Sequence, residues 1–145
     1  MFEAPPVDSD LFEKTRSLLT HDFVRILGYF LEDGAKAVAE IGDGFRSRDA
    51  ARMIRPAHTL KTEARQFGAL PLGDLAERIE GLARRCVEVG DAPDELLVPI
   101  AKLAPLWRET VAVFERETNP LVERGRATVA SFGRAEGTNQ SFGRL

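Results

Sequence analysis

The stretch AHTLKTEARQFGA, residues 57–69, places apolar residues at helical spacing around one of the two histidines of the chain. On a helix that turns about 100° per residue, one face collects the apolar side chains of Met53, Ala57, Leu60, Ala64 and Phe67. His58 points nearly opposite to Leu60, so its imidazole is expected to face solvent. The stretch therefore predicts an amphipathic helix that buries one face and exposes a histidine on the other.

The same periodicity extends in both directions and predicts five helices. A short first helix begins at Asp8 or Asp10, with Leu11, Leu18 and Leu19 as its apolar side, and a second runs over about 21–42 and ends at Gly42 and Gly44. The third spans about 47–68, the fourth starts at Pro71 and stops at Gly90, and the fifth runs from about Asp94 to Asn119-Pro120. No strand pattern competes. The predicted fold is all-α, an up-down-up-down four-helix bundle with a short N-terminal capping helix.

The last part of the chain differs in character from the predicted bundle of residues 1–119. Residues 120–145 contain SFGR twice, at 131–134 and 141–144. We expect a mobile C-terminal tail, because chain termini fray unless they are tied down. The alternative is a short docking motif present in duplicate.

Composition and charge narrow the class of protein. The chain has 145 residues, 43% of them hydrophobic, with a net charge of −3. No apolar run approaches the roughly 20 residues of a membrane span, and the single cysteine, Cys86, cannot form an internal disulfide. Residues 46–65 carry six basic and two acidic side chains, a basic island in an acidic chain. The pattern favours a cytoplasmic protein whose partner is acidic or phosphorylated, and it disfavours binding to nucleic acid or a membrane.

The surroundings of His58 suggest phosphoryl chemistry. A neutral imidazole is a nucleophile, and a cation one helical turn away, here Lys61, can neutralise charge on an arriving phosphoryl group. The exposed face around His58 is expected to offer no carboxylate to orient the ring, and the chain has no glycine-rich nucleotide motif and no cluster of acidic metal ligands. Such a site could carry a phosphoryl group but could not drive its transfer alone.

The segment AHTLKTEARQFGALPLGDLAERIE, residues 57–80, resembles the histidine-containing phosphotransfer (HPt) domain. The positions that match the family pattern are Ala57, His58, Leu60, Lys61, Gly68, Leu72, Leu75, Ile79 and Glu80. With the neighbouring helices, the resemblance covers about residues 8–118. It implies a four-helix bundle that relays phosphate in bacterial multistep phosphorelays, with His58 as phosphoacceptor and Lys61 as its electrostatic helper. Thr62 stands where the family has glycine.

The resemblance also implies partners. A response-regulator receiver domain, a hybrid histidine kinase or both would bind over the face that carries Ile54, Arg55, Thr62, Arg65, Gln66 and Ala69. The receiver would supply the aspartyl phosphate and Mg²⁺, so this chain is expected to be a monomeric phosphocarrier, not an enzyme, with no cofactor of its own.

Three other functions remain open from the residues alone. The chain could be a non-catalytic adaptor that binds a receiver or kinase without being phosphorylated. His21 and His58 could hold a haem or metal ion if both rings turned into a shared pocket. The chain could also be the phosphoacceptor domain of a chemotaxis-type kinase, which would normally continue into kinase domains.

Overall fold

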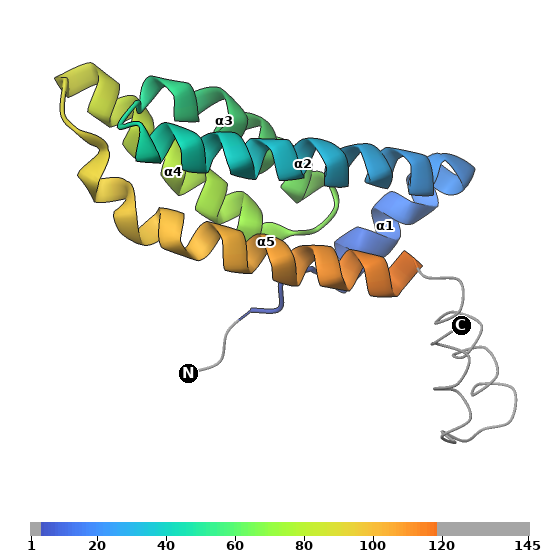
Figure 1. Ribbon diagram of the computed structural model, residues 1–145. Helices are drawn as coiled ribbons and strands as arrows, with labels where there is room; N and C mark the ends of the chain where they lie inside the picture. Colours follow the sequence, from blue (N-terminus) through green and yellow to red (C-terminus); the bar gives the residue numbers. More distant parts are fainter. Residues whose placement is uncertain (1–3, 119–145) are drawn as a thin grey trace, which may run out of the picture. The chain divides into compact units, whose positions relative to one another are not determined.

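The computed structural model describes residues 4–118, and all regular structure in that range is helical (Figure 1). The α-helices are α1 (Ser9–Leu19), α2 (Phe23–Arg46), α3 (Ala51–Gln66), α4 (Leu70–Val89) and α5 (Leu97–Thr118). Two short 3₁₀ helices, η1 (Thr20–Asp22) and η2 (Pro93–Leu96), precede α2 and α5. The four long helices pack as a bundle, which confirms the predicted fold class. Within the described range, no helix is both long and apolar enough to cross a membrane.

Residues up to Thr110 form one compact unit, and the remaining described residues, 111–118, continue α5 as helix. The predicted tail, residues 120–145, lies outside the described residues, so the tail and the boundary before it stay predictions.

The loops between the central helices are short. Only residues 47–50 separate α2 from α3, and only 67–69 separate α3 from α4. Pro71 lies in the first turn of α4, where its missing N–H costs no helical hydrogen bond, and Gly90 ends that helix in the left-handed conformation with φ 73°. Both signals were predicted from the sequence.

The end of α2 was predicted wrongly. The helix continues through Gly42 and Gly44 to Arg46, and α3 begins at Ala51 instead of Ser47. A Cβ atom at Gly44 would lie 2.6 Å from Cγ of Met53, so glycine at this position lets α2 approach α3 closely. Gly44 therefore serves helix packing, not helix termination.

Aromatic rings join α1, α2 and the corner after α3. Phe12 and Phe23 meet edge to face with ring centroids 5.3 Å apart, and Phe30 stacks on Phe67 at 5.3 Å. Burial of each such ring stabilises the fold by about 1.5–3 kcal/mol. The apolar side of α1 was predicted wrongly, because its buried side chain is Phe12 whereas Leu11 and Leu18 are exposed.

The same corner is held by the backbone. Gly68 has φ 82°, and its carbonyl accepts a hydrogen bond of 2.7 Å from the amide of Asp8. The Thr15 hydroxyl donates to the carbonyl of Gln66 at 2.6 Å. The N-terminal helix is thus tied to the end of α3, the helix that carries His58.

Candidate functional site

The helix α3 presents His58 as its periodicity predicts. Met53, Ala57, Leu60 and Ala64 are buried without measurable exposure, and the side chain of His58 is 55% exposed. Burial of the apolar face fixes the rotation of the helix, and this rotation holds the imidazole at the surface.

A carboxylate from another helix orients the imidazole. Oε2 of Glu80, on α4, lies 2.9 Å from Nδ1 of His58. The expectation that no carboxylate lies beside His58 is therefore wrong. The helical wheel of α3 shows only the residues of that helix, whereas Glu80 belongs to α4 and reaches His58 across the contact between the two helices.

Glu80 is a buried charge with several partners. Its side chain is only 7% exposed, and it accepts contacts from Lys61 Nζ at 2.7 Å on Oε1 and from Arg84 Nη2 at 2.8 Å on Oε2. Burial alone would raise the pKa of this carboxyl group, but the hydrogen bonds from Lys61, Arg84 and His58 outweigh burial and lower its pKa to about 2. Glu80 is therefore ionised at neutral pH.

The ionised carboxylate determines which imidazole nitrogen is available. A carboxylate can only accept a hydrogen bond, so the hydrogen bond with Glu80 requires the proton of a neutral His58 to be on Nδ1. The lone pair is then on Nε2, and no side chain or backbone group within residues 4–118 bonds to that nitrogen. The arrangement gives His58 one oriented, nucleophilic nitrogen at the surface.

Lys61 lies close to His58 but acts through Glu80. Its ammonium is bound to the carboxylate, and its side chain is only 20% exposed. Lys61 and Arg84 together carry two positive charges against the single negative charge of Glu80. The surroundings of His58 therefore keep a net positive charge that favours an anion.

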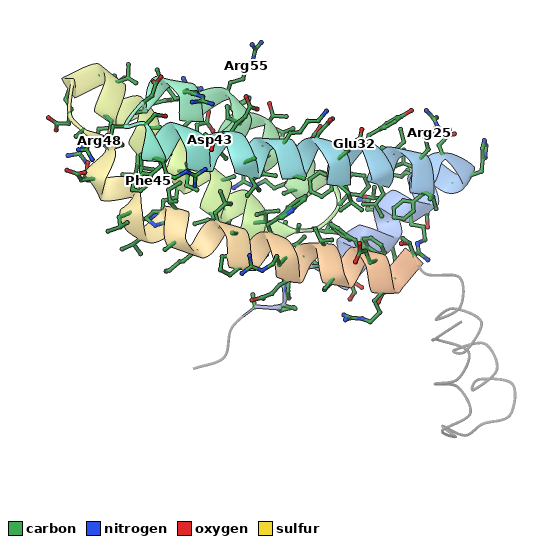
Figure 2. The ribbon with its side chains drawn as sticks, in the orientation of Figure 1. Arg25, Glu32, Asp43, Phe45, Arg48 and Arg55 are labelled. Carbon is green, nitrogen blue, oxygen red and sulfur yellow. The ribbon has the colours of Figure 1, made fainter. Side chains whose placement is uncertain are left out.

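Carboxylates neutralise most of the basic island outside this cluster. Arg48 pairs with Asp94 at 3.1 Å, and the other paired arginines contact carboxylates on α2 or α4: Arg46, Arg52 and Arg65. Arg55 makes no ion pair with any residue of the described range, and its side chain projects away from α3 (Figure 2). Arg55 is one helical turn before His58, so it offers an unpaired cation beside the imidazole.

The remaining predicted surface residues divide into two groups. Thr62 and Gln66 are exposed and Ile54 is partly exposed, as their predicted contact with a partner requires. The Thr62 hydroxyl donates to the carbonyl of His58 at 3.2 Å, which keeps this side chain folded against its own helix. Ala69 is fully buried, so its place on the partner surface was predicted wrongly. Because α3 ends at Gln66, its helical periodicity does not continue to Ala69.

The paired-histidine site is contradicted by the structure. His21 is exposed in η1, where Nδ1 lies 3.3 Å from the Thr20 hydroxyl, and His58 is exposed on α3. Neither ring turns into a shared pocket. Across residues 4–118, no three or more His, Cys, Asp or Glu side chains are grouped so that they could hold a metal ion.

Glu80 is the residue that sequence reasoning missed as part of the site. A signal was present, since Glu80 lies between the buried residues Ile79 and Ala83 on the inner side of α4. A charged side chain at such a position is almost never buried unless it is paired.

Comparisons with known proteins agree with this geometry. The sequence model of the Hpt domain matches residues 25–117. Among solved structures, histidine-containing phosphotransfer protein B (HptB) from Pseudomonas aeruginosa PAO1 is similar, with a TM-score of 0.68 and 19% sequence identity over 79% of this chain and 96% of that chain. At this identity the likeness shows the fold. No curated protein sequence matches the chain.

Proposed function

Because the chain belongs to the Hpt domain family, we propose that it accepts a phosphoryl group on His58 and passes it to a receiver domain. Histidine phosphotransfer within a phosphorelay is the role of this family, and its domains interact with receiver domains and kinases. We further propose that His58 is the acceptor. It would take the phosphoryl group from a receiver aspartate or from a kinase and pass it to the receiver domain of a response regulator.

The hydrogen bond between His58 and Glu80 is the observation that carries the proposal. It holds the proton on Nδ1 and leaves Nε2 as the nucleophile on an exposed side chain. An ordinary surface histidine has no need of a buried, ionised carboxylate behind its ring. A nucleophile whose reactive group is oriented by a neighbouring side chain is typical of covalent catalysis.

In the transfer step, His58 gains the phosphoryl group and this chain releases no proton or other group. The lone pair of Nε2 attacks phosphorus, the N–P bond forms, and the bond from phosphorus to the aspartyl oxygen breaks with its electrons on the carboxylate. The proton stays on Nδ1, where Glu80 stabilises the positive charge that develops on the ring. The receiver supplies Mg²⁺, which offsets the charge of the phosphoryl oxygens.

Lys61 supports this step as a positioning residue. It binds Oε1 of Glu80 and so holds the carboxylate whose other oxygen orients His58. Arg55, which pairs with no carboxylate of residues 4–118, is the better placed cation for direct contact with the acidic surface of a receiver. Since the receiver provides the metal, the proposal requires no cofactor from this chain.

The test is phosphate transfer from a labelled receiver. The chain is incubated with phosphorylated receiver domains and Mg²⁺, and acid-labile, base-stable label is measured on the parent protein and on His58→Gln. We expect label on the parent only, with the melting temperature of the variant nearly unchanged. Label retained on His58→Gln would refute the assignment of the acceptor. Binding of a receiver without any labelling of the parent would favour the non-catalytic adaptor.

A further inference from the structure

Three of the six glycines within the described helices have a packing reason to lack a side chain. An added Cβ would lie 2.3 Å from Trp107 at Gly34, 2.6 Å from Met53 at Gly44, and 2.7 Å from Arg65 at Gly73. Real Cβ atoms do not approach other atoms this closely. At these three positions, the helices and side chains of this chain explain the glycine.

Gly81 has no such reason. It lies in the interior of α4, it is exposed, and a Cβ built on it meets no atom within 4 Å. Its φ angle is not in the left-handed region. Glycine in a helix interior lowers stability relative to alanine, and no contact within residues 4–118 explains this loss of stability at Gly81.

Gly81 lies next to the phosphoacceptor site. It is four residues after Glu77 and three before Arg84, and such residues share one helix face. Glu77 contacts Arg65 on α3, and Arg84 binds the same oxygen of Glu80 that orients His58. These three residues, Glu77, Gly81 and Arg84, form an α4 ridge along the side of the helix that meets the His58 helix.

We infer that the α4 ridge is part of the docking surface for the receiver domain, and that Gly81 provides the clearance for its close approach. The inference rests on the proposed function and extends the binding surface from α3 onto a second helix. Charge is complementary at Arg84, because its side chain is 55% exposed and the receiver brings an acidic site to His58, whereas the carboxylate of Glu77 is paired with Arg65.

The chain contains a matched control in Gly28. This glycine is also exposed in a helix interior, and a Cβ built on it also meets no atom within 4 Å. It lies on α2 beside Phe30, which stacks on Phe67 after the end of α3. Phe67 lies roughly 13 Å from His58 along the axis of α3, so Gly28 is near the C-terminal end of that helix, away from His58. Substitutions at Gly28 and Gly81 should thus have the same effect on stability and different effects on docking.

The experiment compares alanine and glutamine at both positions in the full chain. All four variants should melt about 2–5 °C higher than the parent, because each replaces a helical glycine. Phosphoryl transfer from one phosphorylated receiver should slow at least tenfold in Gly81→Gln and by less in Gly81→Ala. Both Gly28 variants should stay within twofold of the parent. Glutamine is neutral, so any loss at Gly81 reflects bulk and not charge.

A small phosphodonor separates docking from chemistry. Phosphoramidate gives its phosphoryl group to an imidazole nitrogen and releases ammonia, without a protein partner. Labelling of His58 by phosphoramidate should be equal in the parent and in all four variants. Receiver transfer to Gly81→Gln at the parental rate would overturn the inference while leaving the proposed function intact. Loss of phosphoramidate labelling in Gly81→Gln would also overturn it, since the effect would then lie in the site itself. A parent that accepts phosphate from no receiver would instead refute the proposed function.

Discussion

Nδ1 of His58 and Oε2 of Glu80 lie 2.9 Å apart, although 22 residues separate them in the chain. The contact joins α3 to α4 and gives the exposed imidazole a fixed tautomer. It also makes the reactivity of a surface residue depend on a side chain that a partner protein cannot touch, because Glu80 is buried.

Glu80→Gln should slow phosphoryl transfer while His58 itself is unchanged. The amide no longer demands a proton on Nδ1, so the ring can adopt the other tautomer, and the positive charge of the intermediate loses its partner. By analogy with other carboxylates that orient histidines, we expect a loss of about 10–100-fold. The measurements are transfer rates and ¹⁵N NMR shifts of the imidazole, which report the tautomer. Glu88→Gln is the control, since Glu88 lies on the same helix, is exposed, and is not the carboxylate that bonds to His58. An unchanged tautomer in Glu80→Gln would contradict the orienting role.

Glu80 should also produce an acid-dependent loss of stability. Its pKa is lowered to about 2 in the folded protein, from 4.5 for an unperturbed carboxyl group. A group with a lowered folded pKa stabilises the fold at pH values above its unfolded pKa, and this stabilisation is lost as the pH falls toward its folded pKa. The free energy of unfolding should therefore fall by about 3 kcal/mol from this group between roughly pH 5 and pH 2.

Urea denaturation of the parent and of Glu80→Gln across that pH range checks this expectation. The stability difference between the two proteins should be largest near pH 6–7 and should shrink toward pH 2. A difference that stays constant with pH would show that Glu80 is not the titrating group.

Lys61 should act on transfer through Glu80. We expect Lys61→Ala to slow transfer more than Arg46→Ala, because Arg46 pairs with Asp43 and makes no contact with Glu80. In a protein that already carries Glu80→Gln, Lys61→Ala should slow transfer little further. The effects of two substitutions are not additive when both residues act through the same contact. A double-mutant cycle of transfer rates measures this coupling. Additive losses would instead indicate direct contact between Lys61 and the phosphoryl group.

Arg55 should govern the rate of association with the receiver. Its charge is not balanced by a described carboxylate, so Arg55→Ala should reduce the association rate about two- to tenfold at low salt and weaken its dependence on salt. Stability should change by no more than about 0.5 kcal/mol, because the side chain is exposed. Stopped-flow binding at several salt concentrations tests this, with Arg46→Ala as the paired control. Equal effects of the two substitutions would argue for diffuse steering by the whole basic island.

The sequence was sufficient to predict features that depend on local periodicity. The burial of Leu60 and the exposure of His58 follow from the rotation of one helix, and Pro71 and Gly90 mark helix ends through backbone chemistry. Features that depend on contacts between helices were missed. Gly44 was interpreted as a helix terminator because its close approach to Met53 is invisible in the chain order. The pairing of Glu80 with His58 was missed for the same reason.

The attachment of α1 to the end of α3 has a consequence for motion. Asp8 bonds to the carbonyl of Gly68, and Thr15 bonds to that of Gln66, so the last turn of the His58 helix cannot fray unless α1 detaches as well. Helix ends usually open first and exchange their amide hydrogens fastest. Here the amides at the end of α3 should exchange slowly and together with those of α1, as one cooperative unit. The chain thereby keeps the helix that carries His58 rigid through a segment that lies outside the four-helix bundle itself.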